Sequence, residues 1–148
     1  MTVKVVNFSA LRKTLNEKDK DFFVKKPGIA YVIAVTREKC SGCEKQKQLF
    51  EKLSDKMKIM HGNSVEFFRV HANYNSESKE ETIECLEAFQ TVAFPTYVIY
   101  IKDHQGKNRE TYRSIEPPMR EIERNVKMSV ELADGFEPKK QQSSSKKG

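Results

Sequence analysis

Apolar residues along the chain gather in short runs that are separated by polar and charged segments. The run 29–35 is unbroken and rich in β-branched residues, which predicts a strand buried on both of its faces. Four further segments have the β-branched and aromatic content of strands: 3–8, 65–72, 96–101 and 109–112. The last two of these flank a polar turn at 103–106, so they are predicted to form a β-hairpin.

Other apolar residues recur at spacings of three and four, which is the pattern of amphipathic helices. After Cys43 this pattern predicts a helix that ends near His61, with one apolar face: Leu49, Phe50, Leu53, Met57 and Met60. The pair Pro117 and Pro118 is expected to open a last helix that Gly135 ends. The apolar face of that last helix is the following set: Met119, Ile122, Val126, Val130 and Ala133.

A shorter helix is predicted near the N-terminus, from Ala10 into the region 18–20. Ser9 is its expected N-cap, because a serine side chain can accept a hydrogen bond from the free N–H groups of the first turn. Leu11 and Leu15 would lie on one face of this helix.

Another helix is predicted to end near Gln90. Ser78 and Glu81 have the spacing of a capping box at its start. Its apolar face consists of these residues: Ile83, Leu86 and Phe89. Cys85 lies among them and is interpreted as a small apolar packing residue, with a regulatory or second resolving thiol as the alternative.

The predicted order of elements is β-α-β-α-β-α-β-β-α, which places the chain in the α/β class. With 148 residues, 37% of them hydrophobic and 32% charged, one globular domain with a sizeable core is expected. We assign this domain to residues 1–135. Residues 136–148, in which lysine and serine are the commonest types, are expected to form a flexible basic C-terminal tail.

The motif Cys40-Ser41-Gly42-Cys43 lies between the predicted buried strand and the helix that follows it. Cys40 would stand just before the first helical turn, where free backbone N–H groups and the helix dipole favour an anion. The thiolate is the reactive form of cysteine, and such a position lowers the pKa of a thiol. With only 3 cysteines in the chain, a redox-active or metal-binding pair is expected rather than a disulfide scaffold.

Composition limits the classes of partner. The mean hydropathy is −0.71, and no apolar run approaches the ~18 residues of a membrane span. The formal net charge is +6, but residues 137–148 carry four Lys and one Glu, which is half of it, so a nucleic-acid partner is not favoured. The start of the chain has no signal-peptide pattern. We therefore expect a monomeric cytoplasmic protein with no nucleic-acid or membrane partner.

These elements and motifs together resemble the thioredoxin fold and its thiol-disulfide oxidoreductases. The cysteine pair follows the second strand, and Phe94-Pro95-Thr96 stands before the first hairpin strand. In the thioredoxin-like family an apolar residue, a cis-proline and often a threonine occupy that place. The resemblance covers roughly residues 3–133 and implies a three-layer sandwich, with a central mixed sheet flanked by helices.

The resemblance also implies roles for individual residues. Cys40 would be the exposed attacking thiolate, and Cys43, more buried, would resolve the mixed disulfide. Phe94, Pro95 and Thr96 would form the substrate-binding loop. The backbone of Phe94 would pair there with an extended segment of the substrate, beside the cis-proline.

Several positions depart from the pattern of thioredoxins. Lys39 replaces the tryptophan that precedes the first cysteine, and Ser41 and Gly42 replace the intervening Gly-Pro, so these three residues are candidate modulators of the thiols. Ala34 stands where thioredoxins have a buried aspartate. The chain is also longer between the cysteines and the proline, and the extra length is placed in a loop at 73–79.

We interpret the protein as a thiol-disulfide oxidoreductase of cell redox homeostasis, which acts on protein or peptide disulfides and is recycled by a redox partner. No cofactor is implied, because the sulfur atoms carry the electrons. One alternative is a peptide-binding or chaperone-like module around Phe94 and Pro95 with little turnover. Another is a metal site of Cys40, Cys43 and Cys85 with a histidine, although the sequence has no compact second pair of ligands.

Overall fold

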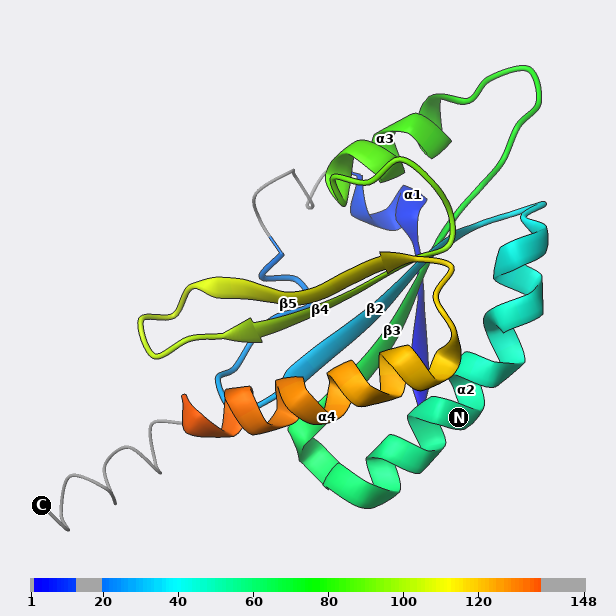
Figure 1. Cartoon of the computed structure of the whole chain (residues 1–148). Coiled ribbons are helices and arrows are strands. Elements are labelled where there is room, and N and C mark those ends of the chain that lie inside the picture. Colours follow the sequence, from blue (N-terminus) through cyan, green and yellow to red (C-terminus); the bar gives the residue numbers. More distant parts are fainter. Residues whose placement is uncertain (1, 13–19, 137–148) are drawn as a thin grey trace, which may run out of the picture.

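The computed structural model describes residues 2–12 and 20–136 (Figure 1). Within these ranges the chain forms five strands: β1 (Val3–Asn7), β2 (Ala30–Arg37), β3 (Val65–Ala72), β4 (Thr96–Lys102) and β5 (Asn108–Ile115). It also forms four α-helices: α1 (Phe8–Leu11), α2 (Ser41–His61), α3 (Glu80–Ala88) and α4 (Met119–Gly135). A short 3-10 helix, Gly62–Ser64, joins α2 to β3. The predicted order of strands and α-helices is confirmed.

The strands form one sheet in the order β1-β3-β2-β4-β5. β1 and β2 both run parallel to β3, whereas β4 runs antiparallel to β2 and to β5. The sheet is therefore mixed, as expected, and β2 lies at its centre. Residues 30–36 of β2 are all buried, because this strand has a neighbour on each side and a layer of side chains on each face.

Successive residues of β2 point to opposite faces of the sheet and enter two separate cores. On one face, α2 and α4 pack over the set that includes Val32. On the other face, α1, α3 and the segment around Phe23 pack over the set that includes Ile33. Figure 1 shows the two long helices on one side of the sheet and the two short ones on the other. The chain thus has the predicted three layers.

The first helix differs from its prediction. α1 begins at Phe8, directly after β1, so Ser9 lies inside the helix and Asn7 is the N-cap residue. Asn7 makes no side-chain capping hydrogen bond. The reason for the earlier start is packing, because Phe8 and Leu11 are both buried in the core beneath α3. The rest of the predicted helix, including Leu15, falls in residues 13–19, outside the described part of the chain.

The third helix is shorter than predicted, and it turns a different face toward the core than its sequence pattern indicates. α3 begins at Glu80 with Lys79 as its N-cap, so the capping box of Ser78 and Glu81 is wrong. The Glu81 carboxylate instead accepts a hydrogen bond from the backbone N–H of Asn73, at 2.6 Å. The buried residues are Cys85, Ala88 and Phe89, whereas Ile83 is 51% exposed.

The long helix α2 has a narrower buried face than its sequence predicts. Phe50, Leu53 and Met57 are buried, but Leu49 and Met60 are each about half exposed. No helix in the described part of the chain is long and apolar enough to cross a membrane. The predicted basic tail lies outside the described residues, except for Phe136, which packs partly buried against the core beneath α4.

Candidate active site

The end of β2 delivers the cysteine motif to the start of α2. The backbone N–H of Glu38 donates to the carbonyl of Ala72 at 2.9 Å, which continues the pairing of β2 with β3 past its last residue. Lys39 then takes a left-handed conformation, with φ of 54°. This change of direction turns the chain out of the sheet, so that Cys40 becomes the N-cap of α2.

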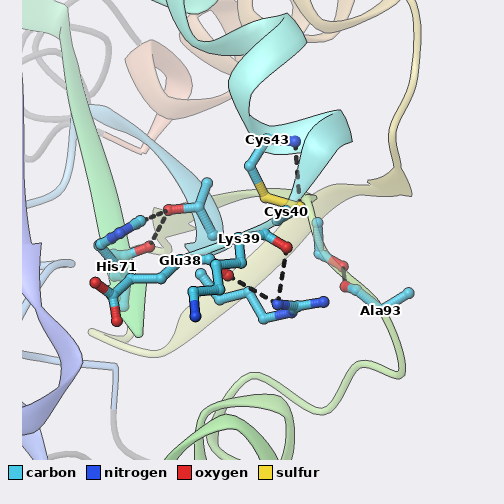
Figure 2. Close-up of a disulfide and its surroundings, with 10 residues drawn as sticks. Glu38, Lys39, Cys40, Cys43, His71 and Ala93 are labelled. Atoms are coloured by element: carbon cyan, nitrogen blue, oxygen red, sulfur yellow. Dashed lines mark hydrogen bonds between the residues drawn. A yellow bond between two sulfur atoms is a disulfide. The ribbon is translucent and has the colours of Figure 1, made fainter. Parts of the chain in front are cut away.

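Cys40 and Cys43 form a disulfide, and their Cα atoms are 5.2 Å apart. The backbone N–H of Cys43 donates to Cys40 Sγ at 3.2 Å, as the dashed line in Figure 2 shows. Cys40 is thus an N-cap whose acceptor is sulfur instead of oxygen. After reduction, the same N–H and the positive end of the helix dipole would favour a thiolate at Cys40.

Cys40 and Cys43 are buried to the same extent in the disulfide form. Cys40 is 8% exposed and Cys43 is 7% exposed, so the expectation of a more exposed Cys40 is wrong for this form of the protein. The physical reason is that the disulfide bond holds the two sulfur atoms next to each other at the start of the helix, so their surroundings are similar. What distinguishes Cys40 is its place outside the first turn, where its sulfur accepts a hydrogen bond.

The loop before β4 contains the predicted proline, and the peptide bond between Phe94 and Pro95 is cis. The Thr96 hydroxyl donates to the carbonyl of Ala93 at 2.7 Å and lies 2.7 Å from the Thr91 hydroxyl. Because Thr96 is fully buried, its contribution is to hold the shape of the loop. The assignment of Phe94, Pro95 and Thr96 to substrate binding stays a prediction.

Gly42 lies where the cysteine motif meets the proline loop. A Cβ atom at this position would lie 3.2 Å from Pro95 Cδ and would run into the carboxylate of Glu116. Glu116 has φ of 45°, and its backbone N–H donates to the Pro95 carbonyl at 2.9 Å. A residue without a side chain at position 42 therefore lets the loop and the acidic residue approach the disulfide. Ser41, by contrast, is exposed.

The surroundings of Ala34 contain polar groups that the sequence pattern did not reveal. Its partners across the sheet are Arg69 on β3 and Tyr97 on β4. Burial, and secondarily the Glu116 carboxylate, raise the pKa of Tyr97 well above its ordinary value. Arg69 Nε is buried and has no hydrogen-bond partner within the described residues. The register of the sheet, which the sequence does not specify, brings these groups together.

The third cysteine is separate from the pair. Cys85 is buried in the core beneath α3, on the opposite face of the sheet from α2. Burial raises the pKa of the Cys85 thiol to about 12, and the nearby Glu81 carboxylate adds to this effect. Within residues 2–12 and 20–136, no group of three or more His, Cys, Asp or Glu side chains is arranged to hold a metal ion.

No protein-family model matches the chain, and no curated protein sequence matches it. Solved structures do resemble it. The thioredoxin of Malassezia sympodialis is 18% identical with a TM-score of 0.57, and the similarity covers 86% of this chain and 90% of that one. Fasciola hepatica thioredoxin is 17% identical with a TM-score of 0.56, over 85% and 98% of the two chains.

The Trx4 domain of ERdj5 is 11% identical, with a TM-score of 0.60 and coverage of 89% of this chain and 98% of that domain. These similarities cover at least 85% of this chain and at least 90% of each of the three other chains. Together with the sheet order and the disulfide at the start of α2, they establish that the chain adopts the thioredoxin fold.

Proposed function

We propose that this protein is a thiol-disulfide oxidoreductase that exchanges disulfides with protein or peptide substrates through Cys40 and Cys43. One observation carries the proposal: the two cysteines form a disulfide at the start of α2, with Cys40 Sγ at the N-cap. A pair that can close in this geometry can also release and accept two electrons. The N-cap position favours the thiolate that starts disulfide exchange.

The proposed reaction has two displacement steps. In the first, the Cys40 thiolate attacks a sulfur atom of the substrate disulfide, and the other substrate sulfur leaves as a thiolate that takes up a proton. In the second, Cys43 loses its proton and its sulfur attacks Cys40 Sγ, which releases the second substrate sulfur. The substrate gains two electrons, and Cys40 and Cys43 end as a disulfide. A redox partner then returns two electrons to this pair.

Substrate binding is assigned to the loop of Phe94 and Pro95. Within the described part of the chain, the backbone N–H and carbonyl of Phe94 make no hydrogen bond. An extended substrate segment could therefore pair with this backbone, as a strand added to a sheet edge does. Lys39, Ser41 and Gly42 would act on the reaction indirectly, through the charge and the space around the two sulfur atoms.

The test of the proposal is a redox titration. The protein is equilibrated in graded dithiothreitol or glutathione buffers, and each cysteine is quantified by alkylation and mass spectrometry, with Cys85 resolved separately. We expect Cys40 and Cys43 to change together in one two-electron transition while Cys85 stays reduced. Independent alkylation of Cys40 and Cys43 would reject the proposal and favour a peptide-binding module. Insulin reduction that disappears in Cys40→Ser would show turnover.

Trapping of substrates gives a second test. The change Cys43→Ser removes the resolving thiol, so mixed disulfides between Cys40 and substrates should accumulate and should disappear on addition of dithiothreitol. The adducts are counted by non-reducing electrophoresis and mass spectrometry. Cys85→Ser in the wild-type background serves as the control and should trap nothing. If Cys43→Ser gives no thiol-sensitive adduct, the proposed mechanism is wrong.

The setting of this activity is also a proposal. The small number of cysteines favours a reducing compartment, and we propose the cytoplasm. We propose that the protein acts as a monomer without a bound cofactor. The midpoint of the redox titration would then show whether the pair gives electrons to substrates or takes them.

A further inference from the structure

Arg37 lies at the end of β2, three residues before Cys40, and its side chain folds over the segment that leads to the disulfide. Its Nη1 atom donates to the carbonyl of Glu38 at 2.7 Å and to that of Lys39 at 3.1 Å. Within the described residues, no carboxylate pairs with this guanidinium, and its Nε and Nη2 atoms make no hydrogen bond. A residue of intermediate exposure beside the cysteine motif thus carries a cation with donor groups free.

Two aromatic rings flank this guanidinium. The centre of the Tyr74 ring lies 4.4 Å from Arg37 Cζ, and the centre of the Phe94 ring lies 5.9 Å from it. Phe94 directly precedes the cis-proline, so one side of the arrangement belongs to the proposed substrate loop. Aromatic faces attract a cation, and they keep water away from part of it without using its donor groups.

Tyr74 comes from the loop 73–79, and hydrogen bonds fix this loop beside the cysteine motif. The Tyr74 backbone N–H donates to Glu38 Oε1 at 3.0 Å. The preceding N–H, of Asn73, donates to the Glu81 carboxylate. The carboxylate of Glu38 is thus directed to the loop and not to Arg37. Lys39 Nζ lies 5.9 Å from the same Tyr74 ring and adds a second positive charge nearby.

A guanidinium that is held in place and has donors free matches one kind of ligand best. Its planar fork binds a carboxylate through two parallel N–H···O bonds, which a lysine ammonium cannot reproduce. The Tyr74 and Phe94 rings beside the guanidinium hold it in one place, so less conformational freedom is lost when such a pair forms. A substrate segment lying on Phe94 would pass within reach of this group.

From this arrangement we propose that Arg37, held by Tyr74, binds a carboxylate of the substrate next to the disulfide that Cys40 attacks. The protein would then prefer protein disulfides flanked by aspartate or glutamate. This inference rests on the proposed function and names the substrate class of the same site. Arg37 acts here as a specificity residue, and Tyr74 as the residue that positions it.

The test compares disulfide peptides that differ at one position, with Glu or Gln next to the attacked cysteine, on each side in turn. Reduction by dithiothreitol gives the intrinsic reactivity of each peptide, by which the enzymatic rates are divided. We expect the reduced wild-type protein to prefer the Glu peptide in kcat/KM by about three- to tenfold at low salt, as suits one charge-assisted contact. The preference should shrink as salt is raised.

Variants separate specificity from structure. Arg37→Gln should remove the preference by slowing only the Glu peptide, and Arg37→Lys should restore part of it. Tyr74→Leu should weaken the preference while Arg37 remains. Arg120→Gln, which removes an exposed positive charge on α4, is the matched control and should keep the preference. Equal slowing of both peptides by Arg37→Gln would mean that Arg37 only supports the backbone before Cys40, and would overturn the inference.

Failure of this inference differs from failure of the proposed function. A wild-type protein that reduces both normalised peptides equally refutes the carboxylate site and leaves the oxidoreductase intact. A wild-type protein that reduces neither peptide, and whose Cys40 and Cys43 also alkylate independently in the redox titration, refutes the proposed function. In that case, binding of the two peptides to the oxidised protein is measured by NMR titration. Tighter binding of the Glu peptide that Arg37→Gln abolishes would support the site, and equal binding would reject it.

Discussion

At the scale of single residues, the surroundings of a sulfur atom assign different chemistry to the cysteines of one chain. Cys40 Sγ accepts a hydrogen bond at a helix start, where a thiolate is favoured. Cys85 is fully buried among apolar side chains, and this burial raises the pKa of its thiol to about 12. The sequence indicated the position of Cys40, because a strand, a turn and a helix could be predicted around it. It also indicated the packing role of Cys85.

We predict that Cys85 makes stability fall at alkaline pH. The folded protein keeps this thiol protonated up to a pKa of about 12, whereas in the unfolded chain it ionises near the ordinary value of about 8.5. The unfolded state therefore binds fewer protons between these values, and the free energy of unfolding decreases as pH rises through that window. Below about pH 7 the Cys85 thiol should give almost no pH dependence, because it is protonated in both states.

The measurement is urea unfolding of wild type and Cys85→Ala between pH 7 and pH 11. The variant should lose about 1 kcal/mol at pH 7, a typical cost for a core substitution. Its stability should then fall less steeply with pH than that of the wild type. Tyr100, whose pKa burial raises to about 12, titrates in both proteins and cancels in the comparison. Parallel curves, or alkylation of native Cys85 at pH 8, would contradict this assignment.

At the scale of secondary structure, strands were predicted better than short helices. The predicted strand 29–35 lies almost entirely within β2, because a strand covered on both faces needs an unbroken apolar run. α3 was predicted in the wrong register. Ile83, Leu86 and Phe89 suggested one face. Phe89, the C-cap residue, is buried as predicted, but the helix itself buries the small side chains of Cys85 and Ala88 and leaves Ile83 exposed. Small residues give a weak apolar signal in sequence, although they let the helix pack closely on the sheet.

A substitution in α3, Ile83→Gln, tests this register, and Phe89→Ala at the C-cap, which is buried in both arrangements, gives the reference cost of a core substitution. Phe89 is fully buried, so Phe89→Ala should cost about 3–5 kcal/mol of unfolding free energy. Ile83 is 51% exposed, so Ile83→Gln should change stability by less than about 0.5 kcal/mol. Both changes are measured by urea unfolding at pH 7, where the Cys85 thiol is protonated in both states. A large loss of unfolding free energy for Ile83→Gln would mean that Ile83 is buried, as the sequence pattern predicted.

The parts of the site that the sequence did not reveal depend on contacts between distant segments. Tyr74 lies near Arg37 because its loop is bonded to Glu38 and to Glu81. Glu116 reaches Gly42 because its own backbone bonds to Pro95 and turns with a positive φ. Neither contact follows from hydrophobic periodicity or from a motif. The sequence showed that extra length lies in a loop at 73–79, but it did not show that this loop folds back beside the cysteine motif.

At the scale of the whole molecule, the two faces of the sheet are covered unequally. One core is covered by α2 and α4, which have 21 and 17 residues. The core on the other face is covered by α1, which has 4 residues, by α3, which has 9 residues, and by the segment around Phe23. Short helices contribute few backbone hydrogen bonds and few buried side chains, so the free energy of local opening should be lower on this face.

We therefore predict that α3 opens before the rest of the domain. In native-state hydrogen exchange with increasing denaturant, amides of α3 should exchange through a local opening of lower free energy than amides of β2, α2 and α4. Exchange of α3 amides at the global unfolding free energy would contradict this. Phe89→Ala should lower protection in α3 more than in α2.

The unequal cover bears on the proposed specificity, because α3 anchors the loop that holds Tyr74 through Glu81, whereas Cys40 and Cys43 lie at the N-cap and in the first turn of α2. Opening of α3 would release Tyr74 from Arg37 and leave the disulfide in place. Phe89→Ala should therefore weaken the preference for acidic peptides while the midpoint potential of Cys40 and Cys43 stays near its wild-type value. If Phe89→Ala both weakens the preference for acidic peptides and shifts the midpoint potential of Cys40 and Cys43, the helices on the two faces of the sheet act as one cooperative unit, and this prediction is wrong.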